Sequence, residues 1–110
     1  MTAPTQARPV VLVSGAARRI GAVIAQTLHA AGHDLALHCR NSRDDLDQLI
    51  ANLERQRANS TLALQADLSD LTQMPALIEA TMQRFGRLDG LVNNASDLFA
   101  TAFGSVTSEQ

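Results

Sequence analysis

Apolar residues follow two alternating patterns along this chain: short continuous runs, and longer stretches in which they are three or four positions apart. Val10 to Val13 are four consecutive apolar residues, three of them β-branched, as is typical of a strand buried on both faces. The next apolar residues have helical spacing and are Ile20, Val23, Ile24, Leu28 and Ala31. The pattern predicts a strand, a turn at Ser14 and Gly15, and a helix that ends at Gly32.

Three more strands are predicted further along the chain. The segments are Asp34–Cys39, Thr61–Ala66 and Leu88–Asn93, each short and rich in Leu, Ala or Val. Polar residues follow each segment, so each strand has a defined end.

Two more helices are predicted between these strands. Ser42 is a good N-cap for the first, which carries Leu46, Leu49, Ile50 and Leu53 on one face. The second runs from about Met74 to Phe85, with Pro75 in its first turn and Gly86 as its stop. We expect its inward face to consist of Leu77, Ile78, Met82 and Phe85.

The predicted elements alternate as β-α-β-α-β-α-β, which indicates an α/β fold with a doubly wound, Rossmann-like parallel sheet. We expect residues 1–8 to form a flexible N-terminal arm. Residues 9–110 would supply the first four strands and three helices of a larger single domain, because the fourth strand would otherwise keep an unpaired edge. The whole enzyme would then have about 250 residues, within the usual size range of a domain.

The amino-acid composition of the chain narrows the kinds of partner that it can bind. The net charge is −2 and the nine basic residues are scattered, which argues against nucleic acid and anionic membrane surfaces. No apolar run approaches the roughly 18 residues of a membrane span, and residues 1–9 do not resemble a signal peptide. A single cysteine, Cys39, is compatible with a reducing compartment and most simply a small buried residue. We therefore expect a cytoplasmic protein that acts on a small molecule, with no metal site.

Polar residues gather at the carboxyl ends of the predicted strands, where ligands bind to sheets of this type. The four clusters are Gly15–Gly21, His38–Ser42, Asp67 with Leu68, and Asn93–Ser96.

The first cluster suits a phosphate. A strand-to-helix turn leaves the first backbone N–H groups of the helix without partners, and an anion fits there. Gly15 permits a tight turn, and Gly21 permits close approach of the helix to the strand or the ligand. A strict G-x-G-x-x-G is absent: Arg19 takes the place of the middle glycine of T-G-x-x-x-G-x-G, and Ser14 that of its Thr. Two glycines in such a turn can equally be structural.

The second cluster favours NADPH over NADH. A dinucleotide fold that prefers NAD usually ends its second strand in an acidic residue, but here no acid occurs before Asp44. Arg40 offers a planar fork for a 2′-phosphate, and Ser42 adds a donor. Two alternatives stay open: Arg40 as a solvated loop residue, and His38 as a packing residue rather than a cofactor contact. Asp67 has an alternative role as well, in an Asx turn.

The motifs SGAARRIG, HCRNS, ADLS and LVNNAS, in this order, resemble those of the short-chain dehydrogenase/reductase family. Arg19, HCRNS and NNAS are most similar to the pteridine reductases. The resemblance implies that NADPH is bound by Gly15, Arg19, Ile20, Gly21, His38, Arg40, Asn41, Ser42, Asp67, Leu68, Asn94, Ala95 and Ser96. It also implies that Asn93 ties neighbouring strands together and that a pterin-like substrate meets Arg19, Ser96 and Leu98.

The resemblance also marks departures. Leu98 stands where pteridine reductases place an aromatic that stacks on the pterin, and only Phe99 and Phe103 are near enough in sequence to replace it. The resemblance implies a Tyr that donates a proton and a Lys four residues later that favours the ionised form of that Tyr, but the chain has no Tyr and all nine of its basic residues are Arg. No catalytic residue is therefore expected within this chain, and a homotetramer is expected by resemblance alone.

Two other functions remain open at this stage. One is a related reductase of a ketone, such as a 3-oxoacyl thioester, and the other is a non-catalytic NADPH-binding module. A methyltransferase-like Rossmann domain is disfavoured by Arg40, where such domains usually have a ribose-binding acid.

Overall fold

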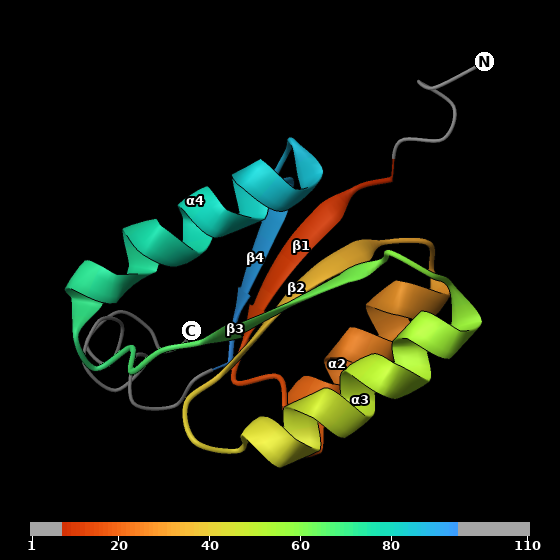
Figure 1. Ribbon diagram of the computed structural model, residues 1–110, viewed down its shortest axis with the longest axis horizontal. Helices are drawn as coiled ribbons and strands as arrows, with labels where there is room; N and C mark the ends of the chain where they lie inside the picture. The colour runs from red at the N-terminus through yellow and green to blue at the C-terminus, as the bar shows by residue number, and fades with distance from the viewer. Residues whose placement is uncertain (1–7, 95–110) are drawn as a thin grey trace, which may run out of the picture.

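The computed structural model describes residues 8–94, and its centre is a four-stranded sheet. The strands are β1 (Val10–Ser14), β2 (Asp34–Cys39), β3 (Thr61–Gln65) and β4 (Gly90–Asn93). All pairings are parallel and the strand order is β3-β2-β1-β4 (Figure 1). The chain builds the sheet outward from β1 through β2 to β3, and then crosses back to place β4 on the other side of β1. The winding therefore reverses at the boundary between β1 and β4, as in a doubly wound sheet.

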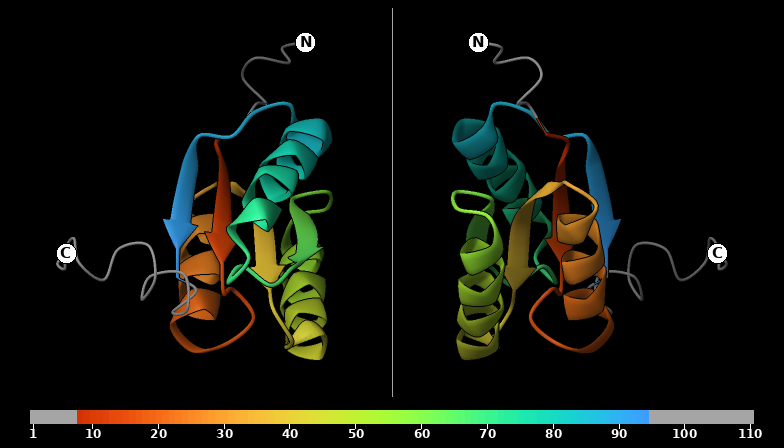
Figure 2. Two further views of the ribbon diagram at one scale, coloured as in Figure 1. Left: turned by 90° about the vertical axis from the view of Figure 1, so that its left-hand side faces the viewer. Right: turned by 90° about the vertical axis from the view of Figure 1, so that its right-hand side faces the viewer.

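Helices cover both faces of this sheet. They are α2 (Arg19–Ala30), α3 (Arg43–Gln56) and α4 (Met74–Phe85), with a short 3-10 helix η1 (Leu71–Gln73) directly before α4. Figures 1 and 2 show α2 and α3 on one face and α4 on the other. The predicted fold class, a Rossmann-like α/β layer, is confirmed.

The core is split by the sheet into two clusters. Val11 and Val13 of β1 pack on the side of α2 and α3, together with Leu35, Leu37 and the α3 leucines. Leu12 packs on the side of α4, with Ala36 and Leu77. All five residues of β1 are buried, so the apolar run at Val10–Val13 is the two-sided strand that the sequence predicts.

The inward face of α2 agrees with the prediction only in part. Ile24 and Leu28 pack against the core, as predicted. Ile20 and Val23, by contrast, are 68% and 58% exposed, and the most deeply buried residues of the helix are Gly21, Ala25 and His29, which are small residues and one histidine at a helical spacing of four positions. Small side chains let α2 approach the sheet closely.

The inward face of α4 is also partly different. Leu77 is buried and Ile78 packs beside it, as expected, but Met82 is 43% exposed. Thr81 is fully buried in its place, because it lies four residues after Leu77 and therefore directly on the same face. Its hydroxyl donates to the Leu77 carbonyl over 2.8 Å, so the polar atom is satisfied inside the core.

Element ends agree with the sequence to within two residues. β3 ends one residue before the predicted end and β4 begins two residues after the predicted start. Gly86 follows α4 at φ +80° and Gly32 follows α2 at φ +100°, the left-handed conformations that glycine adopts easily. Ser42 takes the N-cap position of α3, although its side chain makes no capping hydrogen bond.

β4 is an edge strand. Within residues 8–94 it pairs only with β1, and Leu91 is 46% exposed. In the same range, no helix is long and apolar enough to cross a membrane. Most of the predicted N-terminal arm, residues 1–7, lies outside the described part; Arg8 donates to the Gly32 carbonyl at 3.4 Å.

Candidate functional site

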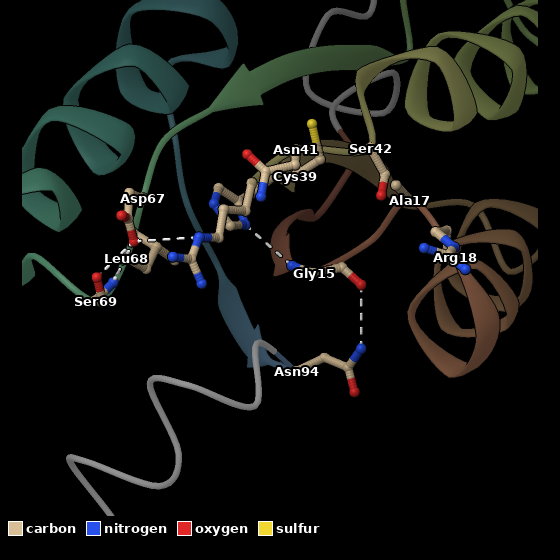
Figure 3. Close-up of a pocket in the computed structure, with 12 residues that line it drawn as sticks. Gly15, Ala17, Arg18, Cys39, Asn41, Ser42, Asp67, Leu68, Ser69 and Asn94 are labelled. Atoms are coloured by element: carbon tan, nitrogen blue, oxygen red, sulfur yellow. Dashed lines mark hydrogen bonds and ion pairs between the residues drawn. The ribbon is translucent and has the colours of Figure 1, made fainter.

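A pocket of about 310 Å³ lies at the carboxyl edge of the sheet, where the four strands end (Figure 3). It is lined by Gly15, Ala17, Arg18, His38, Cys39, Arg40, Asn41, Ser42, Asp67, Leu68, Ser69 and Asn94. His38 and Cys39 are the last two residues of β2, and the other lining residues follow the ends of β1, β2, β3 and β4, so the predicted gathering of polar clusters at one edge of the sheet is present.

The backbone of Gly15 is held from both sides. Its N–H donates to Nδ1 of His38 over 3.0 Å, and its carbonyl accepts from Nδ2 of Asn94 over 3.2 Å (Figure 3). Gly15 has φ +62°, which glycine adopts without strain. The turn after β1 is thus fixed by side chains from β2 and from the residue after β4.

His38 is 1% exposed and both of its ring nitrogens contact backbone atoms. Nε2 lies 2.8 Å from the carbonyl of Ala66, which only accepts hydrogen bonds, and Nδ1 accepts from Gly15. The proton of the neutral ring is therefore on Nε2. Burial lowers the pKa of His38, and the hydrogen bond to Ala66 opposes this shift only partly. The ring joins the ends of β1 and β3 beneath the pocket.

Ser14 joins β1 to β4. Its hydroxyl donates to Oδ1 of Asn93 at 2.9 Å and accepts from the Asn94 N–H at 2.8 Å. The predicted role of Asn93, in tying neighbouring strands together, agrees with this contact. Asn94 is oriented by Ser14 through its backbone, which leaves its side chain directed at Gly15.

The first turn of α2 lies next to the pocket. Arg18 is the N-cap, in extended conformation, and its side chain makes no capping hydrogen bond. Arg19 has φ +56°, the left-handed backbone that glycine would adopt at this place in the glycine pattern. A Cβ on Gly21 would lie 2.0 Å from the Gly15 carbonyl oxygen, so only glycine fits there. Because the Arg18 side chain does not cap them, the first backbone N–H groups of α2 can receive an anion.

The charges of the pocket come from two arginines and one aspartate. Nε of Arg40, the residue after β2, is 3.6 Å from Oδ1 of Asp67, and both side chains are about half exposed. Nε of Arg18 is 3.7 Å from Oδ2 of Asp45, which does not line the pocket. With His38 neutral, the lining carries an excess of positive charge, as suits an anionic ligand.

Asp67 forms the Asx turn that the sequence left as an alternative. Its Oδ1 accepts from the hydroxyl and the backbone N–H of Ser69, at 2.6 and 3.0 Å. These bonds, and the nearby charge of Arg40, hold the pKa of Asp67 below its usual value against a small opposing effect of burial. Asp67 is therefore an anion whose second oxygen, Oδ2, remains an acceptor. The Asx turn and a ligand contact are compatible.

The pocket unites most of the predicted cofactor residues, and these are Gly15, His38, Arg40, Asn41, Ser42, Asp67, Leu68 and Asn94. Arg19, Ile20 and Gly21 lie in the adjoining first turn of α2 but do not line it. Ala95, Ser96 and Leu98 lie outside the described residues, as do Phe99 and Phe103.

Four lining residues were not predicted as cofactor residues. The side chain of Arg18 is 58% exposed, and it borders the pocket. Ala17 and Ser69 are small residues next to predicted ones, and an Asx turn at Asp67 would have indicated Ser69. Cys39 is 2% exposed, in agreement with its predicted packing role, and burial raises the pKa of its thiol.

Comparison with known proteins agrees with this arrangement. Residues 9–110 match the short chain dehydrogenase family. The chain belongs to this family. It is 39% identical to pteridine reductase 1 of Leishmania tarentolae over 91% of its length, and 36% identical to an uncharacterized oxidoreductase of Methylorubrum extorquens over 91%. It is also 34% identical to the 3-oxoacyl-[acyl-carrier-protein] reductase FabG of Staphylococcus aureus over 76% of its length.

The chain spans about 40% of the first two relatives and 34% of the third. Membership of the short-chain dehydrogenase family implies an NAD(P) cofactor, and the pocket offers what a dinucleotide requires: an open helix N-terminus, cationic side chains and an acceptor carboxylate. Among residues 8–94, no group of three or more His, Cys, Asp or Glu is placed to hold a metal ion.

Proposed function

We propose that this chain is the NADPH-binding part of a short-chain reductase. The observation that carries the proposal is the end of β2: Arg40 borders the pocket there, and the segment from Cys39 to Arg43 contains no carboxylate. The ribose of NADH would find no acidic partner at this strand end, whereas the additional phosphate of NADPH would find a guanidinium.

The remaining pocket residues suit the other parts of the cofactor. The pyrophosphate would lie at the first turn of α2, above Gly15, with Arg19 beside it. Asp67 Oδ2 would accept from the adenine amino group and the Leu68 N–H would pair with the ring, while Asn94 and Ala95 would border a ribose. Ser42 would donate to the 2′-phosphate, which fits the absence of a capping bond from its hydroxyl. The cofactor would supply a hydride.

We propose a dihydropterin or dihydrofolate as the substrate, with hydride transfer to a C=N bond. This rests on the similarity to pteridine reductase 1 and on Arg19 and Ser96 at the positions expected to meet a pterin. The chain contains neither the Tyr that would donate a proton nor the Lys that would assist it, so proton transfer would need residues that this chain does not contain. A homotetramer in the cytoplasm remains our prediction for that protein.

A ketone reductase is the second candidate. Leu98 offers no aromatic face on which a pterin could stack, and the relative from Staphylococcus aureus is a reductase of 3-oxoacyl carriers. Purified whole protein should be assayed with NADPH and either dihydrobiopterin or acetoacetyl coenzyme A. Turnover of the pterin alone supports the first candidate, and turnover of the thioester alone supports the second. NADPH binding with no reduction of either would favour a non-catalytic module.

The cofactor proposal is tested by Arg40→Gln. A hydrogen bond to a charged group contributes about 1.5–3 kcal/mol, so the Kd for NADPH should rise about ten- to a hundredfold while the Kd for NADH changes little. Arg55→Gln is the matched control, because Arg55 is exposed near the end of α3 and lies outside the pocket. Titration calorimetry measures the Kd for each cofactor in the wild type and in both variants. An equal loss for NADPH and NADH would remove Arg40 from the phosphate site.

A further inference from the structure

His38 is buried at the pocket, and both of its ring nitrogens contact backbone groups of other segments. Its contacts are the Gly15 N–H at 3.0 Å and the Ala66 carbonyl at 2.8 Å. Gly15 begins the turn that leads to α2, and Ala66 precedes Asp67. The imidazole therefore bridges the two loops that would hold the pyrophosphate and the adenine, in addition to the backbone hydrogen bonds that Ala16 and Ala66 donate to β2.

We propose that His38 is a positioning residue that holds the cofactor site in its binding geometry only while its imidazole is neutral, so that cofactor affinity falls as His38 becomes protonated. The inference rests on the proposed function, because it concerns affinity at the NADPH site. A proton on Nδ1 would turn the acceptor of the Gly15 N–H into a second donor, and two N–H groups cannot share that contact. The Gly15 peptide would then keep only Asn94 as a side-chain partner.

The surroundings of the ring favour this behaviour. The neighbouring strands β1 and β3 contain no charged side chain, and the two charged residues of α4, Glu79 and Arg84, are exposed. The charged groups that share the pocket are Arg18, Arg40 and Asp67, and Asp70 lies in the exposed turn beyond Asp67. Within residues 8–94 no carboxylate contacts the ring to stabilise a positive charge, and burial lowers the pKa of His38. The loss of affinity should therefore occur below pH 6.5, the ordinary value.

Two substitutions separate the two contacts of the ring. In His38→Asn, Oδ1 takes the place of Nδ1 and can accept from Gly15, but the side chain is too short to reach Ala66. In His38→Gln, the amide Nε2 can donate to Ala66, while the acceptor for Gly15 is lost. If the Gly15 contact positions the site, His38→Gln should weaken NADP⁺ binding at pH 8 about tenfold, the usual effect of one unmade buried hydrogen bond, and His38→Asn should restore most of it.

The decisive readout is the pH profile. NADP⁺ and NAD⁺ affinities of the whole protein should be measured by calorimetry from pH 8 to pH 5.5. Protonation of the 2′-phosphate, with a pKa of about 6, weakens NADP⁺ binding in every variant, so the comparison is between variants and between cofactors. We expect the wild type to lose more affinity on acidification than His38→Asn, for both cofactors. Equal profiles would overturn the proposal.

His29→Asn is the matched control. His29 is also 1% exposed and burial also lowers its pKa, but it lies at the C-terminal end of α2, outside the pocket. The pH profile of cofactor affinity in His29→Asn should match that of the wild type. A profile as flat as that of His38→Asn would mean that any buried histidine has this effect, and it would contradict a specific role for His38.

A spectroscopic measurement keeps the inference testable without any cofactor. Long-range ¹H–¹⁵N correlation spectra of the wild type should show His38 as the Nε2–H tautomer at pH 8, and the Gly15 amide signal should shift with the titration of that ring. An Nδ1–H tautomer, or a Gly15 signal that does not follow His38, would overturn the inference. Failure to bind either cofactor at pH 8 would instead refute the proposed function, and the spectra would still decide the role of His38.

Discussion

The side-chain amide of Asn94 donates to the carbonyl oxygen of Gly15 over 3.2 Å, although 79 positions separate the two residues. The contact joins the end of the edge strand β4 to the turn after the central strand β1, at the point where the sheet reverses its winding. Gly21 lies beneath both groups, since a Cβ there would be 2.0 Å from the Gly15 oxygen and 2.8 Å from Asn94 Nδ2. Gly15, Gly21 and Asn94 are thus packed closely together at this point.

We predict that Gly21→Ala disrupts this contact. The added methyl group cannot fit beside the Gly15 carbonyl, so the first turn of α2 must move away from β1 and the Asn94 hydrogen bond must lengthen. The Kd for NADPH should rise more than tenfold, and the protein should lose about 1–3 kcal/mol of stability, as is usual for overpacking. Calorimetry and urea unfolding measure the two effects.

Gly90→Ala is the control for Gly21→Ala. A Cβ on Gly90 in β4 would have its nearest neighbour, Cγ2 of Val11, at 3.7 Å, an ordinary van der Waals contact. This variant should bind NADPH as the wild type does. If Gly21→Ala changed the Kd for NADPH and the stability as little as Gly90→Ala does, α2 would not be packed tightly against the Gly15 turn.

A second prediction concerns Glu54, at the opposite edge of the sheet. Its Oε1 accepts from the Asn59 N–H, and its Oε2 accepts from the Ser60 and Thr61 N–H groups and the Thr61 hydroxyl, at 2.6 to 3.1 Å. Burial opposes the charge, but these four donors hold the pKa of Glu54 below its ordinary value. The carboxylate therefore stabilises the turn between α3 and β3, and none of the ion pairs found in the described part of the chain involves it.

Glu54→Gln should lower the free energy of unfolding by about 1–3 kcal/mol, because an amide NH₂ would face donors that need an acceptor. Glu79→Gln, an exposed change of the same kind on α4, should alter stability by less than about 0.5 kcal/mol. Urea denaturation of both variants at pH 7 makes the comparison. Equal effects of the two substitutions would show that the Glu54 contacts contribute nothing specific.

Much of this arrangement could be predicted because it depends on local patterns. The four strands, the three helices and the polar residues at the strand ends can be predicted from apolar runs, helical spacing and turn residues. The phosphate-binding role proposed for Arg40 can be inferred because no acidic residue directly follows β2. The inward face of α2 could be predicted only in part: Ile24 and Leu28 do pack against the core, but Gly21 and Ala25 carry little hydrophobic signal, and the strongly apolar Ile20 is exposed. The role of His38 was also out of reach, because its partners lie 23 and 28 positions away.

The last prediction is that stability rises with pH between about 5 and 6.5. His29 is buried, and its Nε2 is 2.8 Å from the Ser60 hydroxyl, whose own proton is donated to the Arg57 carbonyl at 2.6 Å. The hydroxyl must therefore accept from Nε2–H, and the neutral ring satisfies this contact. Burial, and then the charge of Arg57, lower the pKa of His29 from its ordinary value of 6.5.

The unfolded chain takes up a proton at His29 near pH 6.5, whereas the folded chain does so only at lower pH. The contribution of His29 to the free energy of unfolding should thus be fully present above pH 6.5. On acidification the free energy of unfolding should fall by at most about 1.4 kcal/mol per pH unit for each such histidine. His38 should contribute in the same direction. His29→Gln, which keeps a donor for Ser60, should reduce the slope in urea unfolding between pH 5 and 6.5. The pKa of Glu54 lies below its ordinary value of 4.5, so Glu54 does not contribute to the slope in this pH range. If His29→Gln left the slope unchanged, His29 would not be neutral and buried in the folded protein.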